Sequence, residues 1–161
     1  MSATLTFPTV KGANLEGRRF TLPADLEGEL NVLLIPFQRW HQEIVNTWIP
    51  GLRALCARYP ALRYYELPTL PTMNPLSRMG IDFGMKMGIP DRAAREATIT
   101  LYLDKADFRR RLAIPDESTV TVMAVARSGA IHWRTTGAWR DDAGQALATL
   151  LQLHFNATSP A

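Results

Sequence analysis

A strand-to-helix turn near residue 40 is where reactive side chains would gather in this chain. The apolar run Asn31-Val-Leu-Leu-Ile-Pro-Phe37 predicts a buried strand, and the residues after it have the spacing of a helix. A helix N-terminus at this position favours a nucleophile, because such a terminus lowers the pKa of a thiol. The segment from Phe37 to Val45 contains no cysteine, so no thiolate can form there.

His41 and Glu43 are the titratable pair at this turn. They could form an acid–base pair, although the helix dipole favours the charge of Glu43 and opposes protonation of His41. Two ligands are too few for a metal, and His132 and His154 could join them only through folding. We expect no metal site and no cofactor.

Recognition is the other chemistry that the turn offers. We expect Arg39, Trp40 and His41 to lie together on an exposed turn, with Glu43 beside them. Arginine and aromatic side chains supply much of the binding energy of protein interfaces. This predicts a binding surface with no catalytic residue, and the alternative is that Trp40 covers the edge of the sheet.

Cys56 is the only thiol in the chain. It follows His41 by about fifteen residues, which is roughly 22 Å along a helix, so it cannot reach the turn. Its spacing from Leu52 and Leu55 predicts an inward-facing, inert cysteine. An enzyme remains the alternative, either a peroxidase acting through Cys56 or a cysteine-independent catalyst that uses His41 and Glu43.

The elements that position the turn alternate between strand and helix. An N-terminal hairpin is expected, then a helix kinked or broken at Pro50-Gly51, and later a short helix capped by Asp104. The expected hairpin strands are 5–10 and 18–22 around a turn at 11–17, the other strands are 31–37, 62–67, 97–103, 120–126 and 131–136, and the later helices are 105–112 and 141–155. This order predicts an α/β domain with one mixed sheet flanked by helices.

An insertion at about residues 72–96 interrupts this alternation. Its glycines and prolines predict one or two imperfect helices, and its methionines include Met85 and Met87. These side chains either complete the core or form an exposed groove or homodimer contact, since unbranched thioethers suit adaptable binding surfaces. We favour the exposed surface.

The composition limits the classes of protein to which the chain can belong. With 161 residues, 47% hydrophobic and 20% charged, the chain is expected to be a single globular domain spanning 1–161. Its net charge of +3 comes from scattered residues, which does not predict nucleic-acid binding. No apolar run is long enough to span a membrane, and the chain has a single cysteine. The segment Met1-Ser-Ala-Thr-Leu-Thr-Phe7 lacks the basic and apolar regions of a signal sequence, so we expect no export. We therefore expect a cytoplasmic protein.

Two stretches of the sequence carry a family resemblance: Phe20-Thr-Leu-Pro-Ala-Asp-Leu-Glu-Gly28 leading into Val32-Leu-Leu-Ile-Pro-Phe37, and Leu101-Tyr-Leu-Asp104 through Arg127-Ser-Gly-Ala-Ile131. Through them the sequence resembles the thioredoxin-like superfamily. It is similar to the peroxiredoxin (AhpC/TSA-like) branch. The Trp40-His41 turn, the insertion and the hairpin Gly129–Gly137 are most similar to mitochondrial ATP synthase assembly factors of thioredoxin-like fold.

The redox residues of that superfamily have no counterpart here. One register places His41 and Ile44 at the cysteine positions, and a register shifted to match the helical Pro50 places Gln42 and Val45 there. The usual cis-proline is also missing from Ser118-Thr-Val-Thr121. The resemblance thus implies a thioredoxin-like protein without thiol redox activity that binds a protein partner in an assembly or chaperone role.

Overall fold

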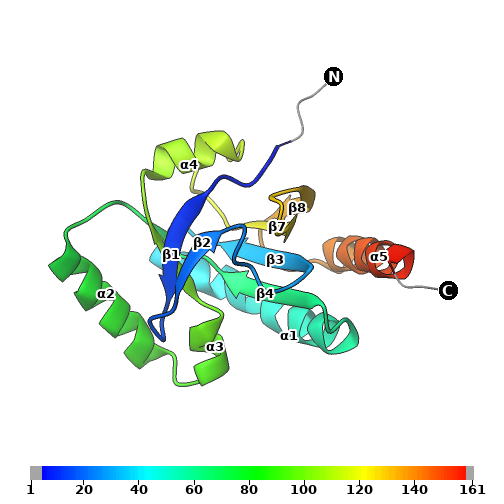
Figure 1. The fold of residues 1–161 in the computed structure, drawn as a ribbon, viewed down its shortest axis with the longest axis horizontal. Coiled ribbons are helices and arrows are strands. Elements are labelled where there is room, and N and C mark those ends of the chain that lie inside the picture. The colour runs from blue at the N-terminus through cyan, green and yellow to red at the C-terminus, as the bar shows by residue number, and fades with distance from the viewer. Residues whose placement is uncertain (1–4, 159–161) are drawn as a thin grey trace.

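The computed structural model describes residues 5–158, which form strands and helices in an alternating order (Figure 1). The strands are β1 (Val10–Asn14), β2 (Arg19–Leu22), β3 (Leu30–Ile35), β4 (Leu62–Glu66), β5 (Thr69–Leu70), β6 (Ile99–Tyr102), β7 (Thr121–Ala126) and β8 (Ile131–Thr136). The helices are α1 (Gln42–Arg58), α2 (Pro75–Gly88), α3 (Arg92–Glu96), α4 (Lys105–Arg111) and α5 (Asp141–Thr158), and a 3₁₀ turn, η1 (Arg39–His41), precedes α1.

The strands form two four-stranded sheets that meet along the β4–β5 segment. Their orders are β2-β1-β6-β5 and β4-β3-β7-β8, with β3–β4 and β5–β6 parallel and the other pairs antiparallel. Backbone hydrogen bonds continue across the junction, from Leu67 N–H to Leu34 O (2.7 Å) and from Leu101 N–H to Pro68 O (2.9 Å). The chain from β4 to β5 therefore runs between β3 and β6.

Strand β3 lies at the centre and is buried on both faces. Leu33 and Ile35 join the core cluster that α4 and the N-terminal hairpin cover, whereas Val32 and Leu34 join the cluster beneath α1 and α5. This alternation follows from the two-residue period of a strand. It also explains why the run is apolar throughout, since neither face reaches water.

The expected alternation of elements is confirmed, the position of one strand is wrong, and of the two forms expected for the first helix, kinked or broken, the break is excluded. The first hairpin strand covers 10–14 instead of 5–10, because Asn14 Oδ1 accepts the N–H groups of Glu16 and Arg18 and so places the turn four residues later. Helix α1 is not broken at Pro50, which lies inside one continuous helix.

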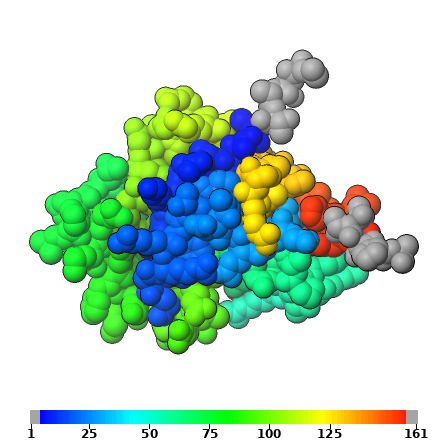
Figure 2. Space-filling view, viewed as in Figure 1, coloured from blue at the N-terminus to red at the C-terminus, as the bar shows by residue number. Residues whose placement is uncertain are grey.

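Helices α2 and α3 form the expected insertion, between β5 and β6. Neither has a buried residue, and α2 forms one end of the molecule (Figures 1 and 2). Two attachments hold α2 in place: Tyr102 of β6 donates to Asp82 (2.6 Å), and Arg95 of α3 donates to the carbonyls of Ile89 and Pro90. The side of α2 that faces α1 is left uncovered.

None of the helices in the described part of the chain is long and apolar enough to cross a membrane.

Candidate binding groove beside the N-terminus of helix α1

The turn before α1 is organised by His41, which is fully buried. Its Nδ1 accepts hydrogen bonds from the N–H of Phe37 (2.9 Å) and of Gln38 (3.3 Å). An accepting Nδ1 is unprotonated, so the neutral ring carries its proton on Nε2. Burial lowers the pKa of His41, against the opposing effect of the Glu117 backbone. The expectation that His41 lies on the exposed surface is wrong, because its ring holds the turn together from inside.

The other residues predicted at the turn are exposed. Trp40 has 58% of its surface accessible, and its ring meets the edge of the His41 ring at a centroid distance of 4.3 Å. Arg39 and Glu43 are also exposed. Because His41 is buried and its Nδ1 is occupied, it does not form an accessible acid–base pair with Glu43. The turn presents an aromatic ring and a cation, which suit recognition.

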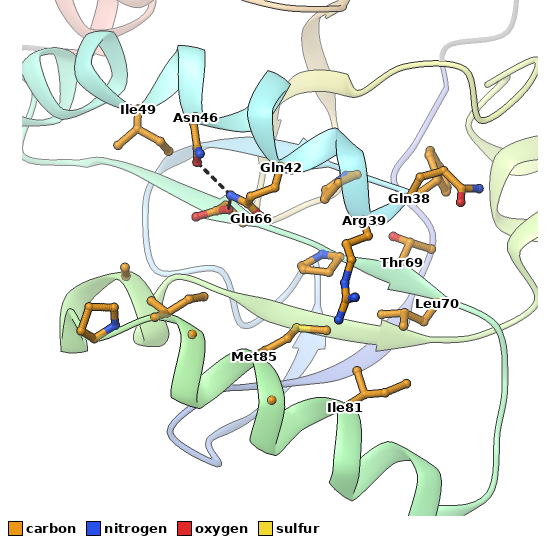
Figure 3. Close-up of a pocket in the computed structure, with 18 of the residues that line it drawn as sticks. Gln38, Arg39, Gln42, Asn46, Ile49, Glu66, Thr69, Leu70, Ile81 and Met85 are labelled. Atoms are coloured by element: carbon orange, nitrogen blue, oxygen red, sulfur yellow. Dashed lines mark hydrogen bonds between the residues drawn. The ribbon is translucent and has the colours of Figure 1, made fainter.

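A groove of about 1150 Å³ opens beside this turn, between α1 and α2, with the β4–β5 segment as its floor (Figure 3). One wall is a single face of α1, and its members recur with helical spacing at Gln42, Asn46, Ile49 and Arg53. Arg39 extends from the turn across the groove toward α2 (Figure 3). Within residues 5–158, no carboxylate forms an ion pair with Arg39.

A short polar chain links the floor of the groove to its α1 wall. Glu66, at the end of β4, is 9% exposed, and its Oε1 accepts a hydrogen bond from Gln42 (3.1 Å), whose amide also donates to Asn46 (2.9 Å) (Figure 3). Burial raises the pKa of Glu66, and the hydrogen bond from Gln42 opposes that effect. In the described part of the chain, the second carboxylate oxygen of Glu66 accepts no hydrogen bond.

The opposite wall is the face of α2 that carries Gly80, Gly84 and Gly88, together with Ile81 and Met85. A Cβ added at any of the three glycines meets no heavy atom within 4 Å. A glycine inside a helix costs about 1 kcal/mol relative to alanine. These glycines therefore weaken α2 without relieving any steric clash in the folded chain, and they widen the groove.

The two methionines singled out in the sequence face different ways. Met85 lines the groove, and its sulfur lies 3.9 Å from Thr100 Oγ1. Met87 is 69% exposed and lies on the outer face of α2, where the exposed apolar residues are Leu76, Met79, Phe83 and Met87. The pair does not form one surface, and neither methionine belongs to the core.

The remaining candidates lie elsewhere. Cys56 is partly buried on α1, and burial raises the pKa of its thiol to about 11, which keeps it protonated and unreactive at neutral pH. The rings of His132 and His154 pack together at 5.4 Å, on the β8–α5 side of the molecule. Between residues 5 and 158, no group of three or more histidine, cysteine or acidic side chains could hold a metal ion.

Glu66 and the glycine face of α2 are the parts of the site that the sequence analysis missed. Two signals were available: an acidic residue at the end of an otherwise apolar strand, and three glycines spaced four residues apart, which places them on one helix face. Only the tertiary structure shows that Glu66 and the glycine face lie beside the turn before α1.

No family model and no curated protein matches the chain. Solved structures do resemble it. A putative electron transfer protein from Aquifex aeolicus has a TM-score of 0.62 at 12% identity, over 94% of this chain and 97% of that one. BsSco, a member of the Sco family of cytochrome c oxidase assembly proteins, has a TM-score of 0.59 at 10% identity, over 93% and 95%.

A third neighbour is a thiol:disulfide interchange protein from Bacteroides sp., with a TM-score of 0.58 at 14% identity, over 92% of this chain and 90% of that one. These likenesses extend over nearly the whole of each chain. At such identities they show the fold and not the activity. This chain has a thioredoxin-like fold with a single cysteine, which lies away from the turn before α1.

Proposed function

We propose that this thioredoxin-like protein is redox-inactive and binds a protein partner in a non-catalytic, assembly or chaperone role. One observation carries the proposal: the turn before α1 is built around a buried structural histidine and holds no thiol, and it presents an exposed tryptophan next to Arg39, which lines a large groove. A side chain that cannot form a thiolate supports no disulfide exchange. An exposed aromatic residue beside a groove is a typical anchor for a partner.

The structural likeness to an assembly protein of the Sco family supports the assembly role. The Trp40-His41 turn and the insertion support it too, because both resemble ATP synthase assembly factors. The enzymatic alternatives have less support from the geometry. A peroxidase would need an accessible thiolate, whereas burial raises the pKa of Cys56 to about 11. A catalyst using His41 would need a reachable ring.

The proposal is tested by two measurements on the full chain. Insulin reduction with dithiothreitol and turnover of hydrogen peroxide should both stay at the uncatalysed rate. Affinity capture from the native cell should recover a partner with the wild type and lose it with Trp40→Ala. Leu153→Ala is the matched control, because Leu153 is an equally exposed apolar side chain on α5, far from the turn. Peroxide turnover that disappears in Cys56→Ser would contradict the proposal.

A further inference from the structure

We propose that the groove between α1 and α2 binds one amphipathic helix of a partner protein, about three turns long, with an acidic side chain facing Arg39 and a hydrogen-bond donor facing Glu66. This proposal deepens the function proposed above, because it names the element of the partner and the chemistry that recognises it.

The dimensions of the groove match a helix. Its α1 wall extends from Gln42 to Arg53 and its α2 wall from Ser77 to Gly88, which is twelve residues in each case, or about 16 Å from first to last at 1.5 Å per residue. The two helices run side by side along the groove (Figure 3). The volume of the groove, about 1150 Å³, exceeds the roughly 300–1,000 Å³ of pockets for small ligands, and its length corresponds to about three turns of a helix.

The α2 wall allows close approach of a helical backbone. Gly80, Gly84 and Gly88 lie on one face, and nothing lies within 4 Å of the position that a Cβ would take at any of them. Small residues on one helix let a second helix pack at short interaxial distance. Ile81 and Met85 beside the glycines, and Ile49 opposite, supply apolar contacts for the occupant.

Three charged side chains line the groove: Arg39, Arg53 and Glu66. Arg53 lies beside Tyr64, and the other two specify the polar groups of the occupant. The Arg39 guanidinium extends into the groove and forms no ion pair with any residue from 5 to 158. Its complement is a carboxylate. Glu66 is nearly buried on the floor and has one carboxylate oxygen without a hydrogen bond in the described chain. Its complement is an N–H or O–H donor on the occupant, because a carboxylate oxygen accepts hydrogen bonds.

A helix suits this pattern better than a small carboxylate with an apolar tail. Such a molecule would satisfy Arg39 but would place hydrocarbon over Glu66. A helix presents two polar side chains on the same face when they are three or four residues apart. It therefore meets both groups while its apolar residues contact Ile49 and Met85.

The test selects binders from a displayed library of helix-forming peptides about three turns long, using the full-length protein as bait. Selected peptides should be helical when bound, and should carry Asp or Glu three or four residues from Lys, Asn or Gln on their binding face. The dissociation constant of the best synthetic peptide should rise at least about tenfold with Gly84→Leu, which fills the groove. Met87→Leu, on the outer face of the same helix, is the matched control and should have no effect.

A charge exchange identifies the contact with Arg39. Arg39→Glu should lower the affinity for the acidic peptide about tenfold. Replacing the acidic residue of the peptide with Lys should restore its binding to the Arg39→Glu variant. Gly84→Leu should also keep or raise the melting temperature, because leucine is the better helix former and a Cβ meets no atom there. This separates blocked binding from misfolding.

Several outcomes would overturn the inference. These are selected peptides without helical structure, peptide affinities unchanged by Gly84→Leu, or a fatty acid or similar carboxylate found in the native protein by mass spectrometry and displaced by the same substitution. A dimer in analytical ultracentrifugation that Gly84→Leu dissociates would assign the groove to a second copy of this chain. If Trp40→Ala abolishes partner capture while Gly84→Leu does not, the proposed function stands and the helix-binding inference fails.

Discussion

His41 shows how one buried side chain can organise the turn at the start of a helix. A nucleophile at the start of α1 would have to reach solvent, but this ring points inward and uses Nδ1 to fix the N–H groups of Phe37 and Gln38. Protonation of Nδ1 would replace an acceptor with a donor facing two donors. The turn is therefore stable only with a neutral imidazole.

This gives His41 a measurable pH signature. Its folded pKa lies below its ordinary value of 6.5, so the unfolded chain binds more protons as the pH falls through that range. The free energy of unfolding should therefore decrease from pH 6.5 downward until the folded pKa is reached. In His41→Asn, whose Oδ1 can still accept a backbone N–H, this decrease should be smaller. Urea denaturation of both proteins between pH 4.5 and 8, at about unit steps, measures the difference. Parallel pH profiles would contradict the assignment.

Cys56 should be a poor nucleophile. With a thiol pKa of about 11, about 0.1% of it is ionised at pH 8, compared with roughly a quarter of an unperturbed cysteine. Alkylation by iodoacetamide at pH 8 should therefore be at least about a hundredfold slower in the native protein than in urea. Mass spectrometry of the labelled fraction over time gives both rates. Similar rates in the two states would restore Cys56 as a candidate for peroxide chemistry.

At this scale the sequence was most informative about what is missing. The lack of a cysteine between Phe37 and Val45 is visible in the sequence alone. The burial of His41 is not, because a histidine beside an exposed tryptophan has no periodicity that fixes the direction of its ring. The ring of His41 faces inward because the N–H groups of Phe37 and Gln38 need a hydrogen-bond acceptor there.

At the scale of elements, α2 is unusual because it crosses from β5 to β6 without burying a residue. Its contacts to the sheet are polar or lie at its edge, such as the stacking of Arg78 on Tyr102 at 4.5 Å. Met85 lies on the face of α2 that lines the groove, and Met87 lies on the exposed outer face. They therefore provide a direct test of whether α2 contributes to the core.

Substitution of both methionines by glutamine should change the free energy of unfolding by less than about 1 kcal/mol, whereas a polar residue in a packed core costs a few kcal/mol. Thermal and urea unfolding measure this. Made singly, Met85→Gln should weaken helix binding in the groove, and Met87→Gln should weaken any self-association through the outer face, as judged by analytical ultracentrifugation. A large loss of stability in either variant would place α2 in the core.

The elements also show where sequence patterns stop being informative. Alternation and capping located β7, β8, α4 and α5, because each has a clear period and a clear boundary, such as the Asp104 cap of α4. The first strand was misplaced, since Lys11-Gly-Ala-Asn14 looks like a turn. Gly12 belongs to the strand for a tertiary reason: a Cβ there would lie 2.8 Å from the side chain of Leu101 on β6.

At the scale of the whole molecule, the fold resembles that of a thiol:disulfide interchange protein, whereas the turn before α1 contains no cysteine. The structure also distinguishes the two registers for the missing cysteines. A reactive thiol must be reachable, and Gln42 is exposed whereas His41 is buried. Val45, three residues after Gln42, is fully buried, as a resolving partner can be. The Gln42 and Val45 register is therefore the one that this fold could use.

This leads to a gain-of-function prediction. In the double variant Gln42→Cys, Val45→Cys, both thiols lie in the first turn of α1, where the helix dipole lowers the pKa of the first. A disulfide should form in air, leaving one thiol, Cys56, that a thiol reagent detects after unfolding in urea, and reduction of insulin by dithiothreitol should become faster than the uncatalysed rate. The variant Gln42→Ser, Val45→Ala should stay inactive, because it makes the same changes in size without the sulfurs. If two cysteines at this turn form no disulfide, then its geometry has departed from that of a redox site, and loss of the thiols alone does not explain the inactivity that we propose.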